Sequence, residues 1–325
     1  MTDQPPSERF FYHSFPRRGR GTDGEIEKGC KILSLITNIG LVMAPEVLKW
    51  SYPHADGSPP REQQTIQRRV CFTELAPHKL KEHAKLFGNF ALEFKIDTLR
   101  SMGALPVFYI PQTTAVDSPD LTSLGSVLVV QTIDAMILTM RLAGIKKNLD
   151  DAPDVKEGRF DATFGFQQPK TFSIDVVEAR NALEALTFAL TPPDMLEQAL
   201  TGLLSCFYPA DNVRNSETLA YYRQREWRIA WNLAIKDEEI LRRPSNEVID
   251  QLLEIDAEFF GRDFPTAAGT RRLAEEALIF PGIGGKRIID MVNRVVVPTD
   301  ALSSANTILA KAAPNVPVVC FEDIT

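Results

Sequence analysis

Five residues with chemically versatile side chains stand in three separate stretches whose apolar and aromatic neighbours are typical of β-strands. The three stretches supply a histidine, a hydroxyl and a carboxylate. Taken singly, each has an ordinary structural explanation. A strand histidine is most often a hydrogen-bonded core residue, a strand-end threonine often caps the next helix, and a Glu–Arg alternation marks the wet face of a half-buried strand. The residues are Tyr12 and His13 in the first stretch, Thr73 in the second, and Glu226 and Arg228 in the third.

Considered together, these side chains suit a site for NAD. Cleavage of the nicotinamide–ribose bond passes through an oxocarbenium-like centre, which a carboxylate stabilises as in glycoside hydrolysis. We therefore expect NAD as the substrate, Glu226 as the catalytic group, and His13 and Thr73 as partners of the ribose hydroxyls. The pyrophosphate needs a cation, and the nicotinamide ring needs an aromatic wall. The candidates for binding the pyrophosphate are Arg228 or Arg17, and the candidates for the aromatic wall are Tyr12, Phe72 and Trp227.

These residues can cooperate only if their strands share one sheet, and the pattern along the chain predicts such a sheet. Strand-like runs occur in both flanks of the chain, whereas the middle is mostly helical in pattern. An α+β protein with a mixed sheet and a largely helical insertion is the simplest interpretation, and a division into two domains stays open. The expected parts are 1–111 and 216–325 for the α+β core and 112–215 for the insertion, with strands at Phe10–Phe15, within Val70–Ile110, at Arg225–Leu233 and within Arg294–Phe321.

The pattern outside the candidate site predicts further helices and one long loop. The apolar run Leu124–Leu138 is interrupted by Gln131 and Asp134, which favours a buried helix over a bilayer span. No element type is assigned to Phe160–Phe172. Helices are expected at Cys30–Trp50 with a break, at Leu121–Leu149, at Asp175–Leu190, after Pro192 and at Glu238–Phe260, a loop at Ser51–Gln67, and a strand–helix–strand unit at Arg294–Phe321.

The composition is that of an ordinary globular protein. The chain has 325 residues and a formal net charge of −7, which gives no general attraction to anionic lipid or nucleic acid. We therefore expect no membrane association, and nucleic acid enters only as a target of modification. The polar start lacks the apolar region of a signal peptide, the four cysteines lack the paired spacing of a zinc site, and His78 and His83 do not share a helix face. These features predict a reduced, cytoplasmic protein with no bound metal.

The block Val70–Ile110 resembles the AbiGi family of abortive-infection proteins. The strand around Glu226 is similar to a Glu-x-Glu-Trp-Arg strand of that family, here with a single Glu, and the closing strand–helix–strand unit with Val297-Pro298 also resembles theirs. The helical middle is not covered. In the family's order, the block carries Cys71-Phe72-Thr73, then His83, then Phe87-Gly88, and then Gly103-Ala104-Leu105-Pro106-Val107-Phe108-Tyr109.

The resemblance implies a role in bacterial defence against phage, often as one member of a toxin–antitoxin-like pair, with a toxin or a phage protein as the partner. A weaker similarity extends to ADP-ribosyltransferases of the DarT kind. Those proteins open with an aromatic–His strand, continue with a helix that ends in Gly-Leu, and carry a late catalytic Glu. Tyr12-His13, Gly40-Leu41 and Glu226 fit this outline, which implies an ADP-ribosyltransferase-like fold.

Two functions stay open at this stage. The first is an enzyme that binds NAD and either transfers ADP-ribose to a macromolecule or hydrolyses NAD. The second is a non-catalytic antitoxin or sensor, in which Glu226 and Arg228 form an exposed pair and Asp117–Pro209 is the partner surface. The spatial relation of His13, Thr73 and Glu226 distinguishes the two, since only the enzyme needs them in one place.

Overall fold

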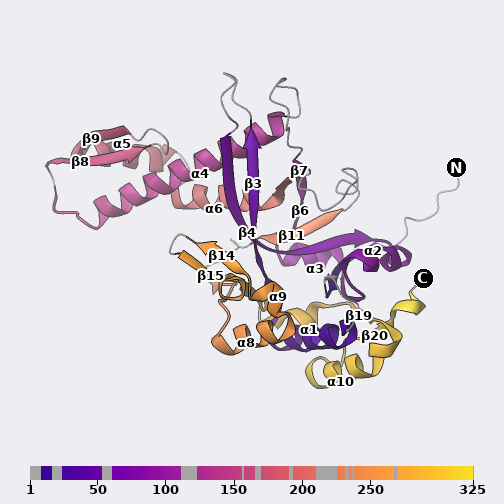
Figure 1. Cartoon of the computed structure of the whole chain (residues 1–325). Coiled ribbons are helices and arrows are strands. Elements are labelled where there is room, and N and C mark those ends of the chain that lie inside the picture. The colour runs from indigo at the N-terminus through magenta and orange to yellow at the C-terminus, as the bar shows by residue number, and fades with distance from the viewer. Residues whose placement is uncertain are drawn as a thin grey trace.

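A mixed sheet of eight strands forms the centre of the protein (Figure 1). The computed structural model describes residues 9–16, 24–52, 61–110, 123–155, 157–164, 170–189, 193–209, 225–230, 234–235, 238–266 and 269–324. The strand order is β20-β19-β5-β1-β4-β11-β6. The eighth strand, β3, pairs with the first part of the long strand β4, residues Arg61–Arg68. The strands are β1 (Phe10–Phe15), β3 (Pro45–Tyr52), β4 (Arg61–Leu75), β5 (Phe90–Phe94), β6 (Leu105–Pro106), β11 (Glu226–Ala230), β19 (Arg294–Val297) and β20 (Val318–Cys320). The expected α+β architecture with a mixed sheet is thereby confirmed.

The two flanks of the chain supply all the strands of this sheet. β19 pairs antiparallel with β5, and β11 pairs antiparallel with β4, so strands of the C-terminal flank lie on both sides of β5, β1 and β4. β19, α10 (Leu302–Ala312) and β20 form the predicted strand–helix–strand unit, with β19 and β20 parallel. The division into a core and an insertion stays a prediction.

Helices cover both faces of the sheet. One face packs on α1 (Glu25–Ile39), α3 (Ile96–Ser101) and α10 through the largest apolar cluster. Gly29 lets α1 approach this closely, because a Cβ there would lie 2.3 Å from the ring of Phe90. Leu80 and Ala84 of α2 (Leu80–Phe87) cover part of the other face.

The residues 123–209, here called the helical arm, contribute no strand to the eight-stranded sheet in the part of the chain that the structure describes. Figure 1 shows the far end of the arm projecting sideways from the sheet. Apolar side chains of α4 and α6 pack on Leu48 and Trp50 of β3, which fastens the arm to the body. The arm consists of α4 (Ser123–Asp150), the hairpin β8 (Arg159–Phe164) and β9 (Lys170–Asp175), α5 (Val176–Ala189), α6 (Pro193–Cys206) and β10 (Phe207–Pro209), and β10 pairs in parallel with β7 (Phe108–Ile110).

The helix α4 packs on α6 and β3 near its start and on α5 near its end, and it is only partly buried, which corrects the expectation of a buried helix. In the described part of the chain, Val127–Asp150 is the single helical segment long and apolar enough to cross a membrane, and 22% of its qualifying 18-residue stretch is buried. One such helix is weak evidence for a membrane protein.

Three of the expected elements differ in part from the structure. The helix expected over Cys30–Trp50 ends at Ile39, because Gly40 adopts φ +105° and leads directly into the strands β2 (Leu41–Met43) and β3. The stretch predicted as a loop to Gln67 is strand on both sides of residues 53–60, which lie outside the described residues. The region Glu238–Phe260 starts with the short strand β13 (Glu238–Glu239). Its helices are α8 (Asn246–Ile255) and α9 (Ala257–Phe260).

A histidine on α2 makes stability depend on pH. His83 stacks on Phe87 with ring centroids 4.3 Å apart, and burial lowers the pKa of His83 to about 4. Between pH 6.5 and 4 the unfolded chain therefore binds a proton that the folded chain refuses, so the free energy of unfolding falls as the pH falls. We expect His83→Gln to reduce this loss by up to about 3 kcal/mol. Urea unfolding at pH 7 and pH 4.5 measures it, with His78→Gln at an exposed position as control. An unchanged pH slope in His83→Gln would show that the imidazole is not buried.

Candidate functional site

Three of the predicted site residues lie in one row across three neighbouring strands. Tyr12 of β1 pairs with Thr73 of β4, and Thr73 pairs with Glu226 of β11. Directly opposed residues of antiparallel strands point to the same face of a sheet, so the three side chains share a face. Thr73 and Glu226 are half-buried, whereas Tyr12 is 1% exposed.

The carboxylate of Glu226 is held from two sides. The Tyr109 hydroxyl donates to its Oε2 at 2.6 Å, and Arg228 Nε donates to its Oε1 at 2.8 Å. Arg228 is 2% exposed, contacts Gln67 Oε1 at 3.4 Å, and places its guanidinium 4.7 Å from the ring centroid of Tyr208. Arg228 is therefore more deeply buried than Glu226, and its hydrogen bond fixes the orientation of the Glu226 carboxylate.

This environment keeps Glu226 ionised. Burial alone would raise its pKa, but the Arg228 charge and the hydrogen bonds from Arg228, Cys71 and Tyr109 outweigh burial and lower the pKa to about 2. Burial, and then the Glu226 charge, raise the pKa of the Cys71 thiol to about 11. The same two causes raise the pKa of Tyr109 above its usual range. At neutral pH the cluster is one carboxylate paired with one guanidinium, flanked by a neutral phenol and a neutral thiol.

Tyr12 belongs to a second polar cluster on the same face. Its hydroxyl donates to Glu93 Oε2 at 2.6 Å. The Glu93 side chain is fully buried, and it also accepts from Asn293 Nδ2 at 2.6 Å and from Arg294 Nε at 2.8 Å. Burial and the neighbouring Glu93 carboxylate raise the pKa of Tyr12. The Tyr12 hydroxyl therefore binds Glu93 and not Glu226, and these contacts do not support its predicted role in cofactor binding.

His13 lies on the opposite face of the sheet from Thr73 and Glu226. It follows Tyr12 directly on β1, and successive residues of a strand point to opposite faces. Its ring lies 5.8 Å from that of Phe72, and its Nδ1 is 2.9 Å from the Cys71 carbonyl oxygen. Burial lowers the pKa of His13, so its imidazole is neutral. The expected meeting of His13, Thr73 and Glu226 does not occur.

The predicted aromatic wall is divided in the same way. Phe72 is fully buried and Trp227 packs against the same core cluster, so both lie on the His13 face. Arg17 lies outside the described residues. Of the expected NAD-binding residues, the structure therefore brings Thr73 beside Glu226 and places Arg228 behind Glu226.

Sequence analysis missed Tyr109, Cys71 and Gln67 as members of the site. Tyr109 carries the sole polar side-chain group of the run Val107–Ile110, which was a usable signal for a buried hydrogen bond. Gln67 is 3% exposed and donates to the carbonyl oxygens of Leu204 and Phe207 at 2.7 and 3.0 Å. Its role could not be foreseen, because it depends on how the helical arm docks.

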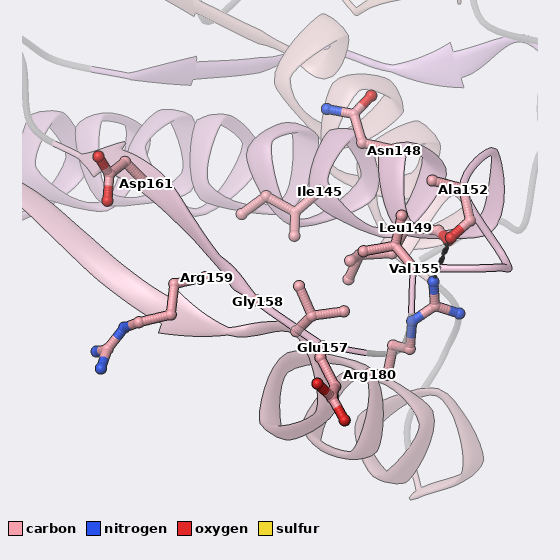
Figure 2. Close-up of a pocket in the computed structure, with 11 residues that line it drawn as sticks. Ile145, Asn148, Leu149, Ala152, Val155, Glu157, Gly158, Arg159, Asp161 and Arg180 are labelled. Atoms are coloured by element: carbon pink, nitrogen blue, oxygen red, sulfur yellow. Dashed lines mark hydrogen bonds between the residues drawn. The ribbon is translucent and has the colours of Figure 1, made fainter.

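A pocket of about 400 Å³ lies elsewhere, at the far end of the arm between α4, the β8–β9 hairpin and α5 (Figure 2). Arg180 closes one side, where its Nη2 donates to the carbonyl oxygens of Leu149 and Ala152 at 2.9 and 2.6 Å. The lining balances two arginines with Glu157 and Asp161 around apolar side chains. This balance of charge points to no particular ligand, and the pocket shares no residue with the Glu226 cluster.

No group of three or more His, Cys, Asp or Glu side chains among the described residues is placed to hold a metal ion. Comparison of the chain with family models, with curated proteins and with solved structures finds no match. The site is therefore interpreted from its own geometry.

Proposed function

We propose that the protein acts in bacterial defence against phage as an NAD-consuming enzyme, either an ADP-ribosyltransferase or an NAD glycohydrolase, with an ADP-ribosyltransferase-like fold. His13 lies on the other face of the sheet, so the proposal rests on Thr73 and Glu226 and not on the expected meeting of all three residues. The observation that supports it is the register that sets the Thr73 hydroxyl beside the Glu226 carboxylate, whose pKa is lowered to about 2. The resemblance to AbiGi proteins supplies the biological setting. A cytoplasmic location fits this role, since NAD and phage components are both found there.

The proposed chemistry needs few groups. The bond between nicotinamide nitrogen and ribose C1′ breaks, its electron pair leaves with nicotinamide, and positive charge develops on the ribose. Glu226 stabilises that charge, and water or an acceptor group on a macromolecule then attacks C1′ and releases a proton. Thr73 binds a ribose hydroxyl. Arg228 and Tyr109 are positioning residues, because each donates a hydrogen bond to the Glu226 carboxylate.

Labelled NAD tests this proposal. With the label in the adenylate part, hydrolysis gives free ADP-ribose, whereas transfer gives labelled protein or nucleic acid. We expect Thr73→Val to raise KM by about tenfold, the size of one lost hydrogen bond, with a smaller effect on kcat. Gln64→Ala is a control on the same strand, at an exposed position outside the register with Glu226. An equal effect of the two substitutions would exclude Thr73 from the site.

The second candidate is a non-catalytic antitoxin or sensor that binds a toxin or a phage protein. The Glu226–Arg228 pair, which this function expected to be exposed, is buried, with side-chain exposures of 12% and 3%. A non-catalytic role is favoured by the hydrogen bonds that Tyr109 and Arg228 already donate to Glu226, as in structural buried pairs. This function predicts that co-expression neutralises a toxin encoded beside the protein. It also predicts that the toxin co-purifies with wild type and with Glu226→Gln alike. Growth arrest by the protein alone would contradict it.

A further inference from the structure

Three arginines converge on one buried carboxylate, away from the candidate site. Glu276 ends the short helix Leu273–Glu276 and is 6% exposed. Its Oε2 lies 2.7 Å from Arg68 Nη2 and 3.8 Å from Arg243 Nη1, and its Oε1 lies 3.3 Å from Arg271 Nη1. One carboxylate therefore serves three guanidinium groups.

Arg68 is the structural partner of this carboxylate. Its side chain is 13% exposed, and its Nε also donates to the backbone carbonyl oxygen of Glu276 at 2.6 Å. Burial lowers the pKa of Arg68, and the neighbouring charge of Arg243 acts in the same direction, while Glu276 opposes both. Arg68 therefore holds Glu276 in place, and Arg243 approaches a carboxylate that already has a buried partner.

Arg243 and Arg271 differ from Arg68 in exposure. Their side chains are 65% and 51% exposed. Among the described residues, Glu276 is the only acid within ion-pair distance of either guanidinium group. Arg271 donates a hydrogen bond to Glu276 at 3.3 Å, whereas Arg243 at 3.8 Å lies beyond hydrogen-bond distance. Two exposed positive charges are therefore left to share a carboxylate that Arg68 already binds.

The backbone holds the two exposed arginines in place. Next to the first of them in the chain, the amide and carbonyl groups of Arg242 exchange hydrogen bonds of 3.0 and 2.8 Å with Ile279. The second, Arg271, lies on β15 (Gly269–Arg272) and pairs directly with Phe264, which is 4% exposed. Each guanidinium group is therefore carried by a hydrogen-bonded segment, which limits the cost of ordering the pair around a ligand.

A phosphate group matches the charge and the donors of this pair. Guanidinium groups bind phosphate through paired N–H···O bonds, and a phosphate monoester carries a charge of about −1.5 to −2 at pH 7. With Glu276 bound by Arg68, the two charges of Arg243 and Arg271 are close to what such a group needs. A carboxylate ligand offers less charge and fewer acceptor oxygens.

A nucleic-acid backbone fits the same surface less well, because exposed carboxylates stand on both sides of the arginines. Glu247 follows Arg243 by four residues. Asp263 pairs across the hairpin with Arg272, the neighbour of Arg271. The chain as a whole has a net charge of −7. A long polyanion needs a continuous basic surface, so a compact phosphate ligand is favoured.

We propose that Arg243 and Arg271 form a binding site for a phosphate group, either free phosphate or the phosphate of a small phosphorylated ligand. Arg68 and Glu276 position the two arginines. The site lies on the face of the sheet opposite the candidate site, because Arg68 follows Gln67 on β4 and successive strand residues point to opposite faces. The inference is therefore independent of the proposed NAD chemistry.

Isothermal titration calorimetry of the full chain with inorganic phosphate and with adenosine monophosphate tests the proposal. Wild type is expected to bind at least one of the two, and to bind adenosine much more weakly. Arg243→Gln and Arg271→Gln are each expected to weaken this binding by about tenfold or more, the size of one lost charge-assisted hydrogen bond. Stronger binding of inorganic phosphate assigns the site to free phosphate, and stronger binding of adenosine monophosphate assigns it to a phosphorylated ligand.

Arg272→Gln is the matched control, because Arg272 is next to Arg271 on β15, is 50% exposed, and pairs with Glu275 at 2.7 Å. Its affinity is expected to equal that of wild type, and circular dichroism checks that all variants are folded. No binding of either phosphate compound by wild type, or an equal loss in Arg272→Gln, would overturn the proposal. Tighter binding of an unphosphorylated single-stranded oligonucleotide, abolished by Arg243→Gln, would assign the arginines to a nucleic-acid backbone and contradict it.

Discussion

Replacing Arg228 by methionine is expected to lower the free energy of unfolding by about 3–5 kcal/mol. Arg228 is 2% exposed and pairs with Glu226 at 2.8 Å. Without the guanidinium, Glu226 becomes a largely buried carboxylate with no opposite charge beside it, and the stacking of Arg228 on Tyr208 is lost as well. Chemical denaturation at pH 7 measures the loss.

The residue directly before this strand offers a matched control. Arg225 also pairs with a glutamate, Glu74, at 3.2 Å, but its side chain is 58% exposed. Arg225→Met should therefore cost less than about 1 kcal/mol. In the double variant Glu226→Gln/Arg228→Met both charges are gone, and we expect part of the stability to return. Equal losses for the two arginines would contradict the buried pair.

The second large effect is expected at Glu93. This fully buried carboxylate accepts hydrogen bonds from Tyr12, Asn293 and Arg294, and so ties β1, β5 and β19 together. Glu93→Ala leaves the buried Tyr12 hydroxyl and two partly buried donors, Asn293 and Arg294, without their acceptor and opens a cavity, so we expect a loss of about 3–5 kcal/mol. Thermal unfolding, with its midpoint and enthalpy, measures the effect.

Tyr12→Phe separates the single hydrogen bond from the whole cluster. It removes the 2.6 Å bond to Glu93 but keeps the ring, and should cost about 1–2 kcal/mol. A Glu93→Ala variant no less stable than Tyr12→Phe would show that Asn293 and Arg294 contribute nothing.

Elements with a clear period were predictable from the sequence. The long helix expected at Leu121–Leu149 is α4, the helix at Asp175–Leu190 is α5, and the strand at Phe10–Phe15 is β1. In each, local residues decide the element. For example, Asp175 Oδ1 accepts from the Val177 amide at 2.9 Å and starts α5. The described residues of the untyped stretch Phe160–Phe172 belong to β8 and β9, and residues 165–169 lie outside the described residues.

The candidate site was predicted only in part, because it depends on register and not on residue type. Tyr12 and His13 are adjacent in the chain, yet a strand directs them to opposite faces, and only the pairing of Tyr12 with Thr73 shows which of them faces Glu226. Shifting β1 by one residue would have brought His13 to the site. A single sequence does not contain this pairing, since it arises from the packing of β1, β4 and β11.

The proposed site is tested most directly by the release of nicotinamide from NAD by Glu226→Gln. Glu74→Gln is the control, because Glu74 follows Thr73 on β4 and points to the other face of the sheet. At a temperature where circular dichroism shows all proteins folded, we expect turnover by wild type, a similar rate for Glu74→Gln, and a rate about 10²–10³-fold lower for Glu226→Gln. No turnover by wild type, or equal rates for the two variants, would contradict a catalytic role for Glu226.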